Sequence, residues 1–273
     1  MPRRVAAGPR VSIVIPALNE GDDIVPCLDR ILEAVALPCE ILVVVDDSAD
    51  STCAAVEGVF ATERTVHVLV NDRGRGPGQA IRYGIDHARA PVVVVTMADG
   101  SDDPRLIDDL TRLVERGVVV AAASRYSPGG QQVGGPALKG FLSRFAGRSL
   151  YFAARVGTRD ATNSFKAYST AFVREVGIDS RHGFELGLEL TAKARRLRRP
   201  IAEIPTIWLD RAAGVSNFKV ATSIPDYLFW YRFAFGRSFH LETMNRKLTR
   251  SRLRLTEVAR AEPHNGRVRR SGD

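Results

Sequence analysis

The residues best suited to chemistry in this sequence are oxygen-bearing side chains that directly follow apolar runs. They lie in PALNE (16–20), DDSAD (46–50) and ADGSDDP (98–104). One such cluster is explained by turn formation and helix capping. Three are harder to explain in this way, because carboxylates brought together repel unless a cation compensates them. Oxygen ligands without neighbouring Cys or His indicate Mg²⁺ or Mn²⁺ holding a diphosphate.

The apolar runs themselves are short and rich in valine, as in strands that are buried on both faces. They are VSIVIP (11–16), EILVVV (40–45), VHVLV (66–70), PVVVVTM (91–97) and GVVVAAAS (117–124). Segments with helical spacing alternate with them, which predicts an α/β fold with a mostly parallel central sheet and helices on both faces. Ligands bind beyond the carboxyl ends of such strands, so we expect the three clusters to line one crevice.

The alternation stops after about residue 124. A Gly/Pro-rich loop (127–136), a helix, TNSFKAY, a helix around 185–196 and IAEIPTIWL follow. We interpret these as a second half of the same sheet. The predicted organisation is a flexible N-terminus (1–10), one catalytic domain (11–222), an aromatic-rich segment (223–242) and a basic tail (243–273).

Charge and composition narrow the class of protein. The 273-residue chain has a formal net charge of +8, and residues 246–273 hold nine Lys/Arg against three Asp/Glu. The three cysteines are scattered, which favours a reducing, cytoplasmic location. No window reaches the roughly 18 to 20 apolar residues of a spanning helix, and no signal peptide is predicted. A nucleic-acid binder would use the basic tail, but the sequence carries no such motif.

Six motifs, in order, resemble the inverting family 2 glycosyltransferases of the GT-A fold, in the dolichol-phosphate mannose synthase-like, polyprenyl-phosphate branch. They are IPALNE, VVVDDSADST, NDRGRGPGQAIRYGI, SRY, DATNSFKAY and EIPTIWLDRAAGVSNFK. The resemblance implies transfer of mannose or glucose, with inversion, from GDP-mannose or UDP-glucose to a polyprenyl or dolichyl phosphate. Two alternatives stay open: a non-lipid acceptor, and a catalytically impaired partner subunit.

The impaired alternative comes from one residue. The family's metal-binding D-x-D aligns with Met97 and Asp99, so its first carboxylate is missing, and a thioether is a poor ligand for a hard cation. Three outcomes are open. Asp99 suffices with phosphates and water, another carboxylate (Asp47, Asp102 or Asp103) substitutes, or the site is impaired.

Carried over by position, the resemblance implies a set of site residues. The nucleotide-sugar donor would contact Pro16, Leu18, Glu20, Val45, Asp47, Ala98, Asp99, Ser101 and Arg211. The lipid phosphate would contact Arg125, Lys139 and Ser143, and Asp99 with Ser101 would hold Mg²⁺ or Mn²⁺. Asp99, Asp160 and Arg211 would be the catalytic residues, with Asp160 as a base or an acceptor-positioning group.

Other interpretations of these residues remain open. Arg125 and Arg211 could form surface ion pairs, and Asp160 could cap a turn. Glu185 and Glu189 could serve the site or lie on a solvated helix face.

A lipid acceptor requires contact with a membrane surface. The segment 223–242 fits either an interfacial helix or a final core helix. The basic tail either binds anionic headgroups or is solvated. We expect a peripheral protein at the cytoplasmic membrane face, with a membrane-protein partner as a further possibility.

Overall fold

The valine-rich runs form the strands of a central sheet in the computed structural model, which describes residues 8–134, 137–180, 183–210, 220–244, 246, 248 and 249. Within these residues the sheet has seven strands in the order β3-β2-β1-β4-β7-β5-β8. The strands are β1 (Val11–Pro16), β2 (Cys39–Val45), β3 (Val66–Val70), β4 (Val92–Val95), β5 (Val120–Ser124), β7 (Lys166–Ser169) and β8 (Ile201–Pro205). A second, two-stranded sheet pairs β6 (Gln131–Val133) with β9 (Ile207–Leu209).

The central sheet is parallel except at β7, which runs antiparallel between β4 and β5. Lys166, the first residue of β7, pairs with Val95 at the carboxyl end of β4. The loop that precedes β7 therefore reaches the edge where the parallel strands end. The predicted mostly parallel sheet is confirmed, and the reversed strand explains how DATNSF joins the carboxyl-end loops.

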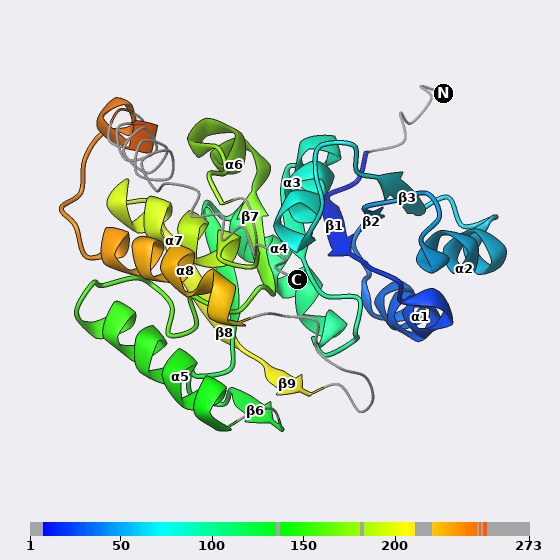
Figure 1. Ribbon diagram of the computed structural model, residues 1–273. Helices are drawn as coiled ribbons and strands as arrows, with labels where there is room; N and C mark the ends of the chain where they lie inside the picture. The colour runs from blue at the N-terminus through cyan, green and yellow to red at the C-terminus, as the bar shows by residue number, and fades with distance from the viewer. Residues whose placement is uncertain are drawn as a thin grey trace, which may run out of the picture. The chain divides into compact units, whose positions relative to one another are not determined.

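Helices cover both faces of the sheet (Figure 1). They are α1 (Ile24–Ala34), α2 (Ser51–Phe60), α3 (Pro77–His87), α4 (Ile107–Glu115), α5 (Ala137–Phe152), α6 (Thr170–Val176), α7 (Leu186–Arg196) and α8 (Val220–Ala234), with short 3-10 turns η1 (Gly21–Asp23) and η2 (Pro104–Leu106). Residues from α1, α2 and α4 form one core with alternate residues of the strands, among them Ile13 and Val43. The opposite face receives α3, whose Gly84 lies so close to Val14 that an added Cβ would be 2.5 Å from its Cγ1.

Contacts divide the chain into two units, Met1–Ser238 and Phe239–Asp273. The first unit contains the sheet and α8, and α8 packs against α7 and α5. The predicted aromatic segment 223–242 thus begins inside α8, and the division of the chain at residue 222 stays a prediction. Among the described residues, no helix is both long and apolar enough to cross a membrane.

Candidate active site

Asp50 connects the loops that follow β1 and β2. Its carboxylate accepts hydrogen bonds from the backbone N–H of Thr52 (2.9 Å), as the N-cap of α2, and from that of Asn19 (3.1 and 2.9 Å). The N–H of Glu20 donates to the Thr52 hydroxyl (3.1 Å). The two loops thus form one rim above the buried Pro16 and Val45.

The neighbouring aspartates have different environments. Asp46 accepts from Asn71 Nδ2 (3.2 Å) and from the backbone N–H of Gly76 (2.6 Å), and so connects its loop to the start of α3. Asp47 is exposed and pairs with Arg75 at 3.4 Å. Of these two carboxylates, Asp47 is therefore the more accessible, and its contact with the nucleotide stays a prediction.

The loop after β4 contains the incomplete D-x-D. Asp99 is half-buried and accepts from the Ser101 N–H at 3.0 Å, while Ala98 and Ser101 are buried. Asp102 is buried and accepts from Thr96 Oγ1 (3.0 Å) and the Met97 N–H (3.4 Å). Burial raises the pKa of Asp102 to about 7 despite these hydrogen bonds.

Asp103 is also engaged away from the expected metal position. It caps η2 and forms a two-point ion pair with Arg105, which holds its pKa below the ordinary value. Asp102 and Asp103 therefore maintain the shape of the loop. Of the substitutes considered for the missing ligand, Asp47 is the most exposed, at 55% against 20% for Asp103, but it follows β2, which β1 separates from β4.

The described residues contain no group of three His, Cys, Asp or Glu side chains placed to hold a metal ion. Asp99 fits a hard cation as a single oxygen ligand, because Mg²⁺ commonly keeps several waters and binds substrate phosphates. The loops after β1, β2 and β4 are called the carboxylate half of the site below.

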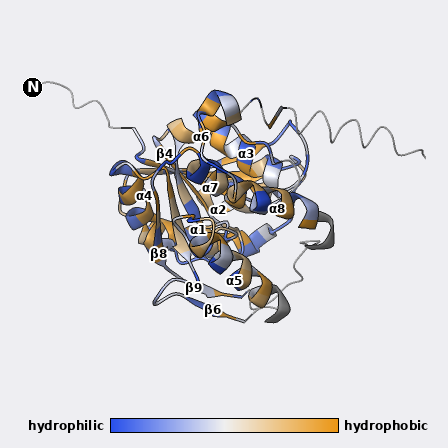
Figure 2. Ribbon diagram, turned by 90° about the vertical axis from the view of Figure 1, so that its left-hand side faces the viewer, coloured by the Kyte–Doolittle hydropathy of each residue, from blue (hydrophilic) through white to orange (hydrophobic). Residues whose placement is uncertain are grey.

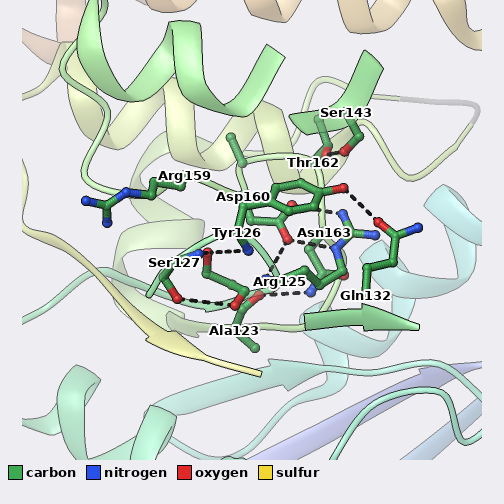
Figure 3. A network of polar contacts seen from close by, with 12 residues as sticks. Ala123, Arg125, Tyr126, Ser127, Gln132, Ser143, Arg159, Asp160, Thr162 and Asn163 are labelled. Atoms are coloured by element: carbon green, nitrogen blue, oxygen red, sulfur yellow. Dashed lines mark hydrogen bonds and ion pairs between the residues drawn. The ribbon is translucent and has the colours of Figure 1, made fainter. Parts of the chain in front are cut away.

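Arg125 and Asp160 form a buried pair beyond β5 (Figure 3). Arg125 donates from Nε to Asp160 Oδ2 (2.7 Å), from a terminal nitrogen to Oδ1 (2.9 Å), and from its backbone N–H (3.0 Å). The Asp160 side chain is fully buried, so neither a surface pair nor a simple turn cap describes these residues. The coulombic field of Asp160 raises the pKa of Arg125 against the effect of burial.

Ser143 lies beside this pair. Its hydroxyl is 2.8 Å from that of Thr162, in the loop that also carries Asp160 (Figure 3). Lys139 lies in α5, one turn before Ser143, but the structure does not describe its side chain. Arg211 lies outside the described residues altogether. The structure thus brings together three predicted residues, Arg125, Ser143 and Asp160, from three separate segments.

Lys166 binds the backbone of the loop that carries Asp160 and Thr162. Its ammonium group is fully buried and donates to the backbone oxygens of Ala161 (3.2 Å) and Asn163. Burial lowers the pKa of Lys166 to about 7, although the Asp160 charge acts in the opposite direction. Arg125, Ser143, Asp160, Thr162 and Lys166 are called the Arg125 half of the site.

The interpretation of Glu189 as part of a solvated helix face was wrong. Its carboxylate is buried and accepts from Lys193 Nζ (2.5 Å) and from the N–H groups of Asp179 (2.6 Å) and Ser180 (2.7 Å). It anchors the loop before α7, and its hydrogen-bonding capacity is used by Lys193 and by the backbone of that loop. Glu185 is buried as well, so a solvated helix face is excluded for both residues.

The sequence analysis missed two residues that hydrogen-bond the loops of the site, Asp50 and Lys166, although the sequence around each one indicates its role. Asp50 precedes Ser-Thr at the start of a helical pattern, which is a capping signature. Lys166 interrupts the apolar run between Phe165 and Ala167, where a charge requires a buried partner.

Known proteins resemble most of this chain. The model of the glycosyl transferase family 2 matches residues 12–177. The polyprenol monophosphomannose synthase of Mycolicibacterium smegmatis is 32% identical over 79% of this chain and 83% of its own length. The undecaprenyl-phosphate mannosyltransferase of Micrococcus luteus is also 32% identical, over 76% of this chain and 87% of its own.

Solved structures share the fold. Glucosyl-3-phosphoglycerate synthase from Mycobacterium tuberculosis, solved with Mn²⁺ and UDP, superposes with a TM-score of 0.61 at 18% identity, over 84% of this chain and 81% of that one. A mannosyltransferase from Pyrobaculum calidifontis, solved with GDP-Man and Mn²⁺, gives 0.56 at 19% identity, over 83% and 64%. With the family model covering most of the chain and the carboxyl-end loops in place, this protein belongs to the glycosyltransferase family 2 and has the GT-A fold.

Proposed function

We propose that this glycosyltransferase moves a hexose, with mannose as the first candidate, from a nucleotide diphosphate to a polyprenyl phosphate with inversion at the anomeric carbon. The observation that carries the proposal is the Arg125 half, in which Asp160 fixes the Arg125 guanidinium near the Ser143 hydroxyl. Both groups lie at the sheet edge that also carries the carboxylate half. Such a pair of donors suits a phosphate acceptor. The two bacterial relatives named for polyprenyl-type lipid acceptors support the lipid.

In the proposed reaction, an oxygen of the lipid phosphate attacks the anomeric carbon as the bond to the leaving diphosphate breaks. The acceptor is already an anion at neutral pH, so the attack needs no strong base. Asp160 is therefore assigned to positioning: three N–H groups of Arg125 bind its carboxylate and fix the guanidinium. Arg211 is assigned to the phosphates, and Lys139 to the acceptor, from the resemblance alone.

On the carboxylate half, Asp47 would contact the nucleotide, and Leu18 with Glu20 would line the rim above Pro16 and Val45. Asp99, with Ser101, would hold the divalent cation, and Ala98 would lie beside the diphosphate. When bound, Mg²⁺ or Mn²⁺ supplies charge neutralisation for the leaving diphosphate. Met97 reduces the protein's contribution to this cation to one carboxylate of the D-x-D.

Two adjacent helices support approach to a membrane surface. On α5, Phe141, Phe145 and Phe152 are 66%, 63% and 70% exposed. Ile224 and Leu228 on α8, and Phe235 directly after its last residue, are also exposed. The α5 residues have the i, i+4, i+11 spacing of one helix face, and Ile224 with Leu228 have the i, i+4 spacing.

The Ser149 hydroxyl lies 2.7 Å from that of Tyr231, so α5 and α8 are in contact, and Figure 2 shows apolar residues along both. Exposed Arg144, Arg148 and Arg232 flank this apolar surface. Aromatic residues with flanking arginines suit the headgroup boundary of an anionic bilayer. The predicted interfacial segment on α8 thereby gains α5 as a neighbour, while the buried Trp230 of α8 packs inward.

The test is transfer of radiolabelled sugar from GDP-mannose or UDP-glucose to polyprenyl phosphate, resolved by thin-layer chromatography. Labelled lipid is expected with one of the two donors and a divalent cation. Transfer to a soluble acceptor alone would favour the non-lipid alternative. Binding of nucleotide sugar without any transfer would favour the impaired partner subunit.

A further inference from the structure

Four arginines line a pocket away from the candidate active site. Arg155, Arg195, Arg198 and Arg199 surround Ile201, together with Gly157 and Ser238. Ile201 is the first residue of β8, which runs parallel to β5. The pocket therefore lies at the amino edge of these strands, opposite the edge that carries Arg125, and shares no residue with the site.

The charge in this pocket is unbalanced. Its lining contains no carboxylate, and burial together with the charges of Arg155 and Arg198 lowers the pKa of Arg195. Arg199 pairs with Glu175 (2.9 Å) outside the lining. In the described part of the chain, the side chains of Arg155 and Arg198 form no hydrogen bond or ion pair. Like charges at this proximity repel unless an anion compensates them.

Helix capping accounts for one of the four arginines. Arg195 donates from Nε to the Ala154 oxygen (2.7 Å) and from a terminal nitrogen to the Gly236 oxygen, near the ends of α5 and α8. This anchored guanidinium forms a fixed wall of the pocket. Arg155 and Arg198 make no such contact, so capping does not explain them.

The backbone gives independent support. Arg155 and Arg198 both have a φ of 55°, in the left-handed region where glycine is favoured. Arg198 directly follows Leu197, the C-cap of α7, where glycine usually ends a helix, and Arg155 lies three residues after the end of α5. The chain instead places a long cationic side chain at both positions.

We propose that Arg155, Arg195, Arg198 and Arg199 form a second binding site, for a phosphate-bearing ligand. Guanidinium groups bind phosphate oxygens through paired, charge-assisted hydrogen bonds. The phosphate comes from a soluble compound or from a lipid headgroup. This proposal does not depend on the identity of the sugar acceptor.

The test compares the full chain with the double variant Arg155→Gly/Arg198→Gly, which removes both unpaired charges and relaxes both left-handed positions. The control, Arg64→Ala/Arg116→Ala, removes the same charge from two exposed arginines elsewhere. Titration calorimetry with inorganic pyrophosphate in EDTA should show at least about tenfold weaker binding in the double variant than in the control. The Tm should be unchanged or higher. Arg155→Asn/Arg198→Asn, which also tolerates the left-handed conformation, repeats the measurement if the glycine pair folds poorly.

A second arm identifies the source of the phosphate. Flotation with phosphatidylcholine vesicles, with and without phosphatidylglycerol, should show weaker phosphatidylglycerol-dependent binding of the double variant if the ligand is a headgroup. Loss of pyrophosphate binding alone assigns a soluble ligand. Equal behaviour of double variant and control in both arms overturns the proposal. The double variant and the control should transfer sugar to a short-chain, water-soluble lipid phosphate at the same rate. Absence of transfer in both proteins would contradict the proposed reaction and leave the phosphate-binding test unaffected.

Discussion

The two halves of the site handle charge in opposite ways. The carboxylate half keeps Asp47 in solvent and Asp99 half-buried, on turns that follow parallel strands. The Arg125 half encloses a guanidinium, a carboxylate and an ammonium in a single buried group. Water and bound ligands can compensate the exposed carboxylates of the first half, whereas the buried charges of the second half compensate one another before any ligand binds. The first half can therefore accommodate a substitution such as Met97, and the second should tolerate few.

The largest effect is expected at the buried pair. Asp160→Asn removes the charge that compensates Arg125 and should lower the free energy of unfolding by about 3–5 kcal/mol. Urea unfolding followed by circular dichroism measures this. In the control, Asp109→Asn at an exposed pair with Arg112, the stability should hardly change. An equal loss of unfolding free energy in the two variants would show that Arg125 depends on its partner no more than an exposed arginine does.

The carboxylate half should respond in binding and not in stability. Asp99→Asn keeps the shape and loses the charge, so Mn²⁺-dependent affinity for nucleotide sugar should fall about 10- to 100-fold. Met97→Asp should raise it by restoring the D-x-D. Calorimetric titration checks both, with Asp29→Asn on the exposed side of α1 as the control. Unchanged affinity in Asp99→Asn would exclude this residue as the metal ligand.

The pH dependence of stability distinguishes the halves through Lys166. Its pKa is lowered to about 7 in the folded state, from 10.5. Between pH 7 and 10 the unfolded chain binds the additional proton, so stability should rise with pH, by up to about 1.4 kcal/mol per unit. Lys166→Met, which has no titrating group there, should lack this component. Parallel pH profiles of the two proteins would contradict the buried ammonium.

The smallest effect is expected at the proposed membrane surface. Phe141→Ser and Phe145→Ser should each weaken flotation with anionic vesicles several-fold, because each removes apolar area that the interface would bury. Val59→Ser, at an exposed apolar residue of α2, should leave flotation unchanged. Truncation after Glu242 or high salt should weaken binding through the tail's charge. If the α5 variants float as the parent does, the aromatic face is not the membrane contact.

The strand and helix pattern is local, and the sequence predicted it well. Valine runs and 3.6-residue spacing report burial directly, so the parallel strands and the helix near 185–196 were found within a few residues. The strand-end position of Asp47 and Asp99 followed from the same pattern. The ordered motifs also sufficed for the family.

The partners of charged groups were decided only by the tertiary structure. Asp160 and Arg125 are 35 residues apart, and the sequence around each residue does not distinguish a buried, two-point ion pair from a surface ion pair. A solvated face was one interpretation of Glu189, because charged Glu185 and Lys193 lie one turn away on either side, yet it is buried against Lys193 and the loop from Asp179. A charge is stabilised by whatever folding brings within a few ångströms of it, and for this reason the sequence determined where the chemistry lies but the fold determined which charges hold one another.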